Sequence, residues 1–258
     1  MKIGVVGLGL IGGSIYKKLL KLGYDVIGIS NSQNGKEKTI TNDLKALKDC
    51  NLVFVATPIN KTIQKLHEIE NYVSENTIVT DCCSLKEFLA KEAFKFKFIP
   101  SHPMAGTEFQ GFENSFEDLF VGAKWVLTPI NDIDTKELEN IIKNLGATPI
   151  ISTPKEHDEA VALISHAPMV IAQALMDTTK DNPLAQKLAS SGFRDMTRLA
   201  LSNLEMAKDM VNYNSKNIEH AILKLYSSLG ELIKDYDNKS KSIKDTRQKM
   251  YKDGKNIL

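Results

Sequence analysis

The sequence has few cysteines, few arginines and almost no net charge. Cys50, Cys82 and Cys83 are its three cysteines, and neighbouring cysteines rarely have the geometry of a mutual disulfide. No pairs of Cys or His stand at metal-ligand spacing, so we expect reduced packing thiols and no metal. The formal charge of +1 provides no field that would attract nucleic acid. We therefore expect no nucleic-acid partner.

Long apolar runs are also absent. Runs such as Leu52–Ala56 are far too short to span a bilayer, and no small-residue cleavage site follows the apolar start of the chain. These absences predict a cytoplasmic protein with no membrane partner. The 42% hydrophobic and 25% charged residues are ordinary for a globular protein, and the length suits two domains.

Two patterns divide the chain and predict domains at 1–152 and 153–258. In the first part, β-rich runs alternate with helical patterns. The predicted strands are Lys2–Val6, Asp25–Ile29, Leu52–Ala56, Thr77–Thr80, Lys97–Ile99, Lys124–Leu127 and Thr148–Ile151. The predicted helices are Ile11–Lys21, Lys61–Tyr72, Leu85–Ala93 and Thr135–Asn144. Apolar strands separated by helices predict an α/β fold of the Rossmann type, with a doubly wound, mostly parallel sheet.

The second part has no convincing strand and predicts an all-helical domain. It opens with a capping box, in which Thr153 and Glu156 flank Pro154. The predicted helices are Lys155–Asp177, Pro183–Ser190, Asn203–Asn212 and a long last one from about Lys216. The last helix carries an apolar stripe of Ile218, Ile222, Leu225, Leu229, Leu232, Tyr236, Ile243 and Met250. Such a stripe suits packing against a helix of a second subunit or of the same chain, and the sequence leaves this open.

A glycine-rich loop, Gly7-Leu8-Gly9-Leu10-Ile11-Gly12, joins the first predicted strand to the first helix. In such a loop the first glycine permits a tight turn, the second lets the backbone approach a pyrophosphate, and the third lets the helix pack on the strand. The helix N-terminus then presents N–H groups and a positive dipole end to the phosphates. Its place between a strand and a helix predicts a dinucleotide cofactor, NAD or NADP.

The second predicted strand lacks the acidic residue that would bind both hydroxyls of the NAD ribose. Ser30 and Asn31 stand there instead, and Lys36 and Lys38 follow. These residues leave room for a 2′-phosphate, which tilts the prediction mildly toward NADP, although no arginine is nearby to clamp that phosphate. Thr57 and Pro58 follow the third strand at the sheet edge where ligands bind, and we expect them beside the cofactor.

Two candidate catalytic residues follow later strands. His102 precedes Pro103, which favours extended backbone, and a loop histidine can take a proton near neutral pH. Judged alone, a histidine in this position is more often a surface residue or one that braces its loop. Ser84 and Glu87 form a capping box for the predicted helix 85–93, and a capping serine would also lie at the mouth of the site.

Only three of the 33 basic residues are arginines, and two of them, Arg194 and Arg198, lie close together. In a chain that otherwise uses lysine, an arginine indicates a need for the planar guanidinium that grips a carboxylate. One of the pair could merely bridge to Asp195. His166 lies on an apolar helix and is more simply interpreted as a buried, hydrogen-bonded histidine than as a catalyst.

Five segments resemble the prephenate and arogenate dehydrogenase family of tyrosine biosynthesis, in the family's order and spacing. They are Gly7–Ser14, Asp81–Lys86, Ser101–Glu108, Ser165–Leu175 and Gly192–Ala200. The resemblance implies a Rossmann domain followed by a helical dimerisation domain, and hence a homodimer. It also implies an oxidative decarboxylation, in which hydride passes to the nicotinamide while the ring carboxylate leaves as carbon dioxide.

The resemblance assigns roles to individual residues. His102 would take the proton of the substrate hydroxyl with Ser84 as its partner, and Arg198 would hold a substrate carboxylate. His166, Gly106 and Thr107 would lie near the substrate. The substrate could be prephenate, giving 4-hydroxyphenylpyruvate, or arogenate, giving tyrosine directly, and no single residue decides between them. The two cysteines of Asp81–Lys86 and the missing ribose-binding acid depart from the family pattern, and the second departure leaves the choice of cofactor open.

Two other functions compete with this one. A reductase of the β-hydroxyacid dehydrogenase type would share the architecture but would need a catalytic lysine in the helical part, and no such motif stands out. A non-catalytic dinucleotide sensor would be expected to have lost residues such as His102 and Arg198, and both are present.

Overall fold

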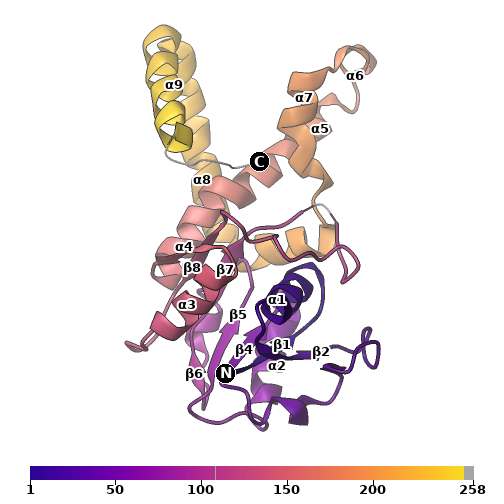
Figure 1. The fold of residues 1–258 in the computed structure, drawn as a ribbon. Coiled ribbons are helices and arrows are strands. Elements are labelled where there is room, and N and C mark those ends of the chain that lie inside the picture. The colour runs from indigo at the N-terminus through magenta and orange to yellow at the C-terminus, as the bar shows by residue number, and fades with distance from the viewer. Residues whose placement is uncertain (108, 253–258) are drawn as a thin grey trace. The chain divides into compact units, whose positions relative to one another are not determined.

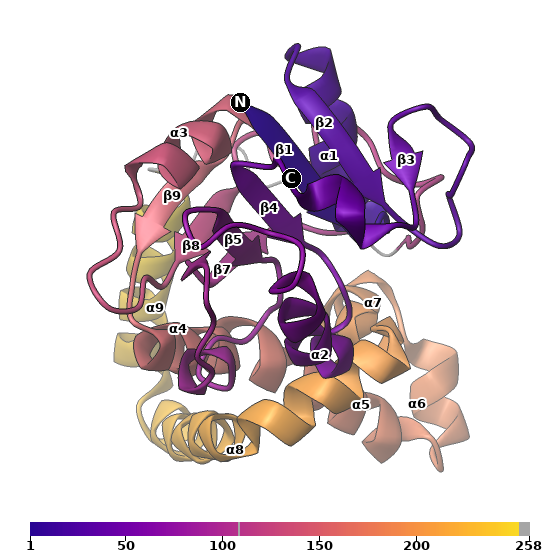
Figure 2. The same cartoon turned by 90° about the horizontal axis from the view of Figure 1, so that it is seen from below.

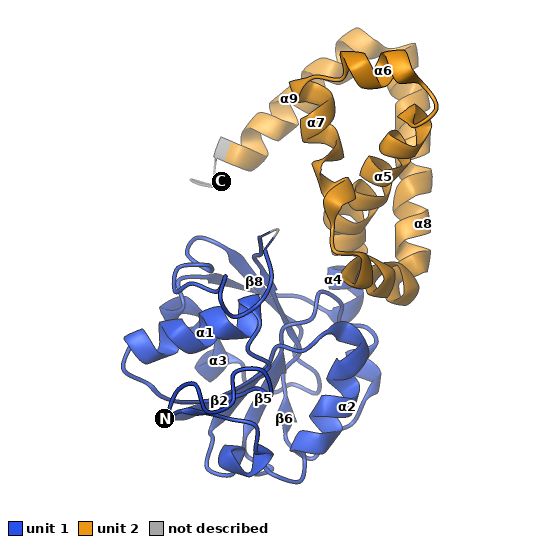
Figure 3. Ribbon diagram, turned by 90° about the vertical axis from the view of Figure 1, so that its right-hand side faces the viewer, with its two compact units in different colours: residues 1–158 blue, residues 159–258 orange. Residues whose placement is uncertain are grey.

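The computed structural model describes residues 1–107 and 109–252. The chain divides into two compact units, Met1–Asp158 and Glu159–Leu258 (Figure 3). The first unit combines strands and helices, and the described part of the second is helical. The predicted fold class, a Rossmann-type α/β domain followed by a helical domain, is confirmed. The predicted boundary between residues 152 and 153 stays a prediction.

The main sheet of the first unit has six parallel strands in the order β3-β2-β1-β4-β5-β6 (Figures 1 and 2). In that order they are Ile40–Thr41, Asp25–Ile29, Lys2–Val6, Leu52–Val55, Ile78–Asp81 and Lys97–Phe98. The strand order reverses at β1, which pairs with β2 on one side and β4 on the other. In open α/β sheets this switch point is where ligands bind, outside the carboxyl ends of the strands.

Helices cover both faces of this sheet because alternate strand residues point to opposite sides. Leu52 and Phe54 of β4 join a core cluster with residues of α1 (Leu10–Lys21) and α3 (Lys136–Asn144). Val53 and Val55 join a second cluster with residues of α2 (Ile59–Ile69). The doubly wound arrangement therefore follows from strands that are apolar on both faces.

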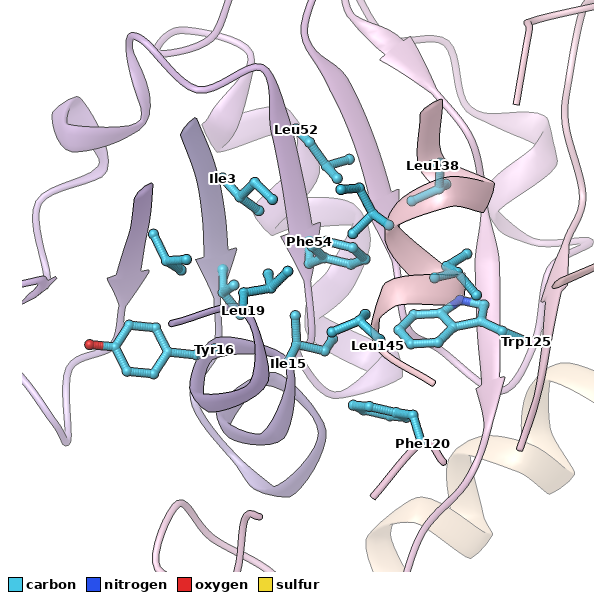
Figure 4. Packing of buried hydrophobic residues seen from close by; sticks show 14 of the residues in the cluster. Ile3, Ile15, Tyr16, Leu19, Leu52, Phe54, Phe120, Trp125, Leu138 and Leu145 are labelled. Carbon is cyan, nitrogen blue, oxygen red and sulfur yellow. The ribbon is translucent and has the colours of Figure 1, made fainter. Parts of the chain in front are cut away.

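A second, three-stranded sheet extends the first core (Figure 4). Trp125 is fully buried, and its ring centroid lies 6.0 Å from that of Phe54 and 5.1 Å from that of Phe120. Trp125 comes from the second sheet and Phe54 from the first. The aromatic cluster therefore holds the two sheets in one core.

The strands of the second sheet are β7 (Ser101–Met104), β8 (Lys124–Leu127) and β9 (Thr148–Ile151). β8 runs antiparallel to β7 and parallel to β9. The prediction of one sheet containing both Lys124–Leu127 and Thr148–Ile151 is therefore wrong, and β7 was predicted as a loop. Pro100 gives the physical reason, since it has no N–H with which to continue the β6 ladder. Its carbonyl instead accepts a hydrogen bond from Thr128 N (2.9 Å).

The predicted helix Leu85–Ala93 is also wrong. Only a short 3₁₀ turn, η2 (Leu89–Lys91), forms there. Asp158, far along the chain, binds the backbone N–H groups of Lys86 (2.8 Å) and Glu87 (2.9 Å), which a capping residue at Ser84 would otherwise bind. A 3₁₀ turn η1 (Leu44–Leu47) and the short strand β3 also form, and neither was predicted.

The helical part opens at the capping box as predicted. Thr153 N donates to the Glu156 carboxylate and Glu156 N donates to Thr153 Oγ1, each over 3.2 Å. The helix then runs through a π turn, η3, before it continues as α5. The elements are α4 (Pro154–Val161), η3 (Ala162–His166), α5 (Ala167–Thr179), α6 (Pro183–Leu188), α7 (Ser191–Thr197), η4 (Arg198–Leu201), α8 (Leu204–Lys234) and α9 (Tyr236–Lys252).

Two predicted helix boundaries need correction. The helices predicted on either side of residues 212–216 are one helix, α8, which is kinked at Asn214 (φ −124°). The long last helix, in turn, ends at Lys234, because Asp235 leaves the helical conformation (φ −139°, ψ 64°). α9 then takes a new direction (Figure 3). The predicted apolar stripe is therefore split over two helices.

One helical stretch among the described residues, Pro154–Thr179, is long and apolar enough to cross a membrane. The expectation of no membrane partner rests on shorter apolar runs such as Leu52–Ala56. Length and composition are weak evidence, because interior helices of globular proteins pass the same test. Within this stretch η3 and α5 pack against α8 and η4. The absence of a membrane partner stays a prediction.

Candidate active site

The three glycines of the loop after β1 have three different environments. Gly7 has φ +90°, and a Cβ there would lie 2.6 Å from the carbonyl oxygen of Ala56. A Cβ on Gly12 would lie 1.9 Å from the carbonyl oxygen of Gly7. A Cβ on Gly9 would meet nothing within 4 Å. Gly7 and Gly12 are thus required by the protein itself, whereas Gly9 leaves open space at the loop surface, as close approach of a ligand to the backbone requires.

The N-terminus of α1 is equipped for an anion. Gly9 is the N-cap residue, no side chain caps the helix, and its first turn has no acidic residue. The N–H groups of a first turn lack partners within their own helix, and the helix dipole favours negative charge there. Leu8, Leu10 and Ile11 surround this end of the helix. These features fit a diphosphate that lies against the loop.

A segment that follows β7 is fastened to the same helix. Ser14 Oγ accepts a hydrogen bond from Phe116 N (3.1 Å). Lys17 Nζ donates to the Ser115 carbonyl (2.8 Å) and lies 4.5 Å from the centroid of the Phe112 ring. A Cβ on Gly13 would lie 2.6 Å from Ser115 Oγ, so this glycine is required for the packing. Residues 112–116 therefore stay close to the helix that carries the glycine loop.

Ser30 and Asn31 lie directly beside the glycine loop. Gly7 N donates to the carbonyl of Ile29, the last residue of β2, over 2.9 Å. Ser30 is half-buried and Asn31 exposed. Of the two lysines that favoured NADP, Lys36 donates to Gln33 Oε1 (2.9 Å). The position where the ribose-binding acid was expected is thus uncharged in the structure as in the sequence.

Tyr16 of α1 ties that helix to the chain after β2. It donates to Glu37 (2.8 Å), and its hydroxyl lies 2.6 Å from Thr39 Oγ1. Burial raises the pKa of Tyr16 to about 12. The phenol therefore stays protonated at physiological pH and serves as a structural donor.

Thr57 and Pro58 follow β4 on the other side of the glycine loop. Thr57 Oγ1 lies 2.9 Å from Thr62 Oγ1, and Thr62 also donates to the Pro58 carbonyl (3.0 Å). Pro58 is exposed at the start of α2. Together with Ser30 and Asn31, they put polar groups on both sides of the loop.

A buried ion pair organises the chain after β5. Asp81 and Lys86 pair with each other, and both side chains are fully buried. Asp81 also accepts hydrogen bonds from Ser101 N (3.0 Å) and Cys83 N (2.8 Å). Lys86 Nζ donates to the Ser101 carbonyl (2.7 Å). The pair therefore anchors the residue that immediately precedes His102.

His102 belongs to β7 and is half-buried. Its Nδ1 lies 2.9 Å from Nε2 of His157, and Nδ1 of His157 lies 2.7 Å from Oδ1 of Asp158. His157 and Asp158 are almost completely buried in the first unit. Neither residue is among those predicted from the sequence for the site. A histidine followed by an aspartate in the first turns of α4 was a visible signal, but nothing local connects it to a strand 55 residues earlier.

Three other predicted site residues belong to the same unit. Ser84 is half-buried, and Asp158 rather than Ser84 binds the N–H groups of Lys86 and Glu87. The predicted capping box is therefore wrong, and among the described contacts the Ser84 hydroxyl has no capping role. Gly106 and Thr107 are exposed. Thr107 Oγ1 accepts a hydrogen bond from Phe109 N (3.2 Å).

The cysteines are not poised for chemistry. Burial raises the pKa of Cys83 to about 12 and that of Cys50 to about 11. Protonated thiols are poor nucleophiles and poor metal ligands. All three cysteines are free. Within residues 1–107 and 109–252, no three His, Cys, Asp or Glu side chains are grouped so that they could hold a metal ion.

The second unit holds the remaining candidates. Arg198 begins η4 and is exposed, and Arg194 lies 3.9 Å from Asp195, with both side chains in solvent. The surface ion pair considered for one arginine thus involves Arg194. His166 is buried in the π turn, and its Nδ1 lies 3.2 Å from Nδ2 of Asn214, the kink residue of α8.

The fold of the first unit and the residues at the edge of its main sheet identify the class of protein. It is a Rossmann-type protein with a dinucleotide-binding loop and with titratable side chains after the neighbouring strands. Residues 22–151 match the family described as prephenate dehydrogenase, nucleotide-binding domain, and residues 153–246 match prephenate dehydrogenase, dimerization domain. A prephenate dehydrogenase of Lactococcus lactis is 31% identical, over 96% of this chain and 77% of that protein. The chain belongs to the prephenate dehydrogenase family, whose members are NAD(P)-linked oxidoreductases of tyrosine biosynthesis.

Solved structures agree with this assignment. The chain is similar to Synechocystis arogenate dehydrogenase, with 34% identity, a TM-score of 0.81 and 98% of each chain covered. It is also similar to the prephenate dehydrogenase of Aquifex aeolicus in complex with hydroxyphenyl propionate and NAD+, with 28% identity, a TM-score of 0.84 and 98% of each chain covered. The family predicted from the five segments is confirmed, as is a nicotinamide dinucleotide cofactor.

The open space at Gly9 generates a prediction. Gly9→Ala should weaken NAD(P) binding by about tenfold or more, equivalent to about 1.4 kcal/mol, because the new methyl group occupies the space that the diphosphate needs. Calorimetric titration with each cofactor measures the loss. The thermal midpoint should stay unchanged, since the methyl group meets no protein atom within 4 Å. Gly192→Ala, which also adds a methyl group in open space, is the matched control, and equal affinities for both variants would contradict the role of Gly9.

Proposed function

We propose that this protein catalyses the oxidative decarboxylation of prephenate to 4-hydroxyphenylpyruvate, with NAD(P) as hydride acceptor. One observation carries the proposal. The glycine loop, Ala56–Pro58 and Asp81–Ser84 follow the neighbouring strands β1, β4 and β5, and Asp81 binds the backbone beside His102. The dinucleotide loop and the residue that anchors the backbone next to a candidate base therefore lie at one edge of the main sheet, as a hydride transfer coupled to proton removal requires.

His102 is the proposed general base. Its ring takes the proton of the substrate hydroxyl as the carbon that bears the hydroxyl loses hydride. Ser84 is the proposed partner at the same hydroxyl, because its half-buried side chain follows β5 next to the Asp81–Lys86 pair. The exposed Gly106 and Thr107 follow β7 and are proposed to contact the substrate.

Arg198 is proposed to hold a substrate carboxylate. An exposed guanidinium in a chain that otherwise uses lysine supports this role, because its planar donors match a carboxylate. His166 is proposed to be near the substrate as well. Its burial and its Asn214 partner support a role as an oriented hydrogen-bonding group rather than as the base.

The residues around the glycine loop fit NAD(P). Gly7, Gly9 and Gly12, with Leu8, Leu10 and Ile11, would hold the diphosphate, Ser30 and Asn31 would face the adenosine ribose, and Thr57 and Pro58 would flank the loop. When bound, the nicotinamide ring accepts the hydride. We propose a mild preference for NADP, because no carboxylate stands at Ser30 or Asn31 to repel a 2′-phosphate. Lys36 is bound to Gln33 Oε1, so the preference rests on the missing carboxylate and not on a nearby cation.

Arogenate is the second candidate substrate. The specific observation in its favour is the 34% identity with Synechocystis arogenate dehydrogenase over nearly the whole chain. Prephenate carries a keto group where arogenate carries an ammonium group. A side chain that accepts hydrogen bonds from an ammonium group would favour arogenate, and the residues identified above include none with that role.

We further propose a cytoplasmic homodimer that forms through the helical domain, with the domains divided at 1–152 and 153–258. The apolar stripe supports the dimer. Ile218 is buried, but Leu229 is 48% exposed, Tyr236 63% and Met250 65% in the single chain. Large apolar side chains that are exposed along both α8 and α9 are expected at an interaction site. A second copy of the helical domain, which the family describes as a dimerization domain, would cover it.

A four-way assay tests the proposed reaction. Purified protein is given prephenate or arogenate, each with NAD or NADP. The formation of NADH or NADPH is followed by the absorbance of the reduced nicotinamide. We expect turnover with prephenate, and a higher kcat/KM with NADP than with NAD. Turnover with arogenate alone would replace the substrate assignment, and no turnover in any of the four combinations would refute the activity.

His102→Asn should slow turnover by about two to four orders of magnitude, because asparagine cannot accept the substrate proton. Cofactor affinity, measured by titration, should stay the same. His67→Asn is the matched control, since His67 is a histidine of the same unit that bonds to Glu70 and Glu92. Normal turnover in the His102 variant would remove this residue from the mechanism.

Arg198→Lys should raise KM by about 10- to 100-fold with a smaller effect on kcat, because lysine loses the paired hydrogen bonds of the guanidinium. Steady-state kinetics with prephenate measure both constants. Arg194→Lys, in the neighbouring exposed ion pair, should leave both unchanged. A KM equal in both variants and the parent protein would contradict the role of Arg198.

A further inference from the structure

Three side chains of the first unit form a continuous hydrogen-bonded chain that ends at the proposed base. His102 Nδ1 lies 2.9 Å from His157 Nε2, and His157 Nδ1 lies 2.7 Å from Asp158 Oδ1. The His157 and Asp158 side chains are 1% and 3% exposed, whereas His102 is half-buried. Bulk water therefore reaches only the His102 end of the chain. The other end is enclosed by protein.

The direction of this chain follows from Asp158. Its Oδ1 accepts a hydrogen bond from Lys86 N and its Oδ2 accepts one from Glu87 N. A carboxylate can only accept, so the proton between Asp158 and His157 belongs to Nδ1 of His157. Nε2 of a neutral His157 is then an acceptor, and the proton between the two rings belongs to Nδ1 of His102. Nε2 of a neutral His102 is then the unprotonated nitrogen of that ring.

Lys86 connects Asp158, at the far end of the hydrogen-bonded chain, with the backbone next to His102. Lys86 offers its N–H to Asp158 and its ammonium group to Asp81 and to the Ser101 carbonyl. Ser101 is bonded covalently to His102. A closed circuit thus runs from His102 through His157, Asp158 and Lys86 back to Ser101. Asp81, Lys86, His157 and Asp158 are the charged and titratable groups that face His102 or its backbone in this circuit.

We infer that His157 and Asp158 are positioning residues for His102: they orient its ring and keep its proton on Nδ1, so that Nε2 is the basic nitrogen. The inference rests on the proposed function for the identity of the base. It adds a specific tautomer and two residues that set it. Neither residue touches the substrate in this scheme.

The proton balance of the step is simple. The substrate O–H bond breaks, its proton bonds to Nε2 of His102, and the electron pair of that bond forms the C=O bond as hydride leaves to the nicotinamide. His102 becomes an imidazolium, and its Nδ1 proton is shared with His157. Asp158, at the far end, stabilises the positive charge. A buried carboxylate that orients a histidine base acts in the same way in the serine protease triad.

The tautomer can be measured directly. Nitrogen-15 NMR of protein labelled at histidine, recorded where the rings are neutral, distinguishes protonated from bare ring nitrogens. The chain has 5 histidines, and the spectra of His102→Asn and His157→Gln assign the two resonance pairs. We expect both His102 and His157 to be protonated at Nδ1. A His102 ring protonated at Nε2 would overturn the inference, whatever reaction the enzyme catalyses.

Kinetics of two His157 variants test the consequence. His157→Gln keeps an acceptor for the Nδ1 proton of His102, and we expect kcat to fall about tenfold. His157→Leu removes that acceptor, and we expect a fall of about 100-fold. KM and cofactor affinity should stay within about twofold of the parent values. If His157→Leu does not fold, the glutamine variant and the NMR measurement still decide the question.

A pH profile separates positioning from packing. Loss of the His157–Asp158 chain destabilises the imidazolium form of His102, so the acid limb of kcat/KM should move to lower pH in His157→Leu. A packing defect would lower the plateau and leave the limb in place, which would overturn the inference. His67→Leu is the control, because it removes another carboxylate-bonded histidine.

The outcomes also separate this inference from the proposed function. An active His102→Asn variant would refute His102 as the base, independently of His157. An inactive His102→Asn variant together with parental kcat and an unmoved acid limb in His157→Leu would refute the positioning role alone.

Discussion

The first unit depends on the buried pair of Asp81 and Lys86. Two charges removed from water carry a large desolvation penalty, and breaking such a pair by removing one partner typically costs about 3–5 kcal/mol. Here the carboxylate is satisfied by Lys86, Ser101 N and Cys83 N, and the ammonium group by the carboxylate and the Ser101 carbonyl. The pair lies where the chain leaves the main sheet after β6 and passes through Pro100 into β7. It links Asp81, the last residue of β5, to Ser101, the first residue of β7, and so fixes the backbone next to His102.

The glycine loop is constrained by the backbone around it, at the carboxyl ends of β1, β2 and β4. Gly7 and Gly12 have no room for a side chain because backbone oxygens of Ala56 and Gly7 occupy it. The loop is therefore fixed by β1, β2 and β4 before any ligand arrives. Of the three loop glycines, only Gly9 would present an added Cβ to no protein atom within 4 Å, which makes it the loop glycine that serves a ligand rather than the fold. The position of the cofactor loop relative to the residues after β5 is thus set by the pairing of β1, β4 and β5.

Features with a local cause could be predicted from the sequence, and those with a distant cause could not. The glycine loop, the main strands and the capping box at Thr153 each depend on neighbouring residues, and all three form. The predicted helix 85–93 forms only as the turn Leu89–Lys91, and the N–H groups that Ser84 was expected to cap bond to Asp158, more than 70 residues away. His102 was found by its motif, but its strand required the break at Pro100 and pairing with β8. His157 could not be predicted because its place in the site depends on a hydrogen bond to His102, which lies on a distant strand.

These distant contacts also explain where the first compact unit ends. The change of periodicity occurs at residue 152, yet the unit extends to Asp158. His157 and Asp158 account for the difference, since their hydrogen bonds reach back to β7 and to Lys86 and Glu87. The first turn of α4 therefore belongs physically to the nucleotide-binding part although it is helical in sequence. The hydrogen-bond partners of His102 in this chain of side chains therefore belong to the same compact unit as His102 itself.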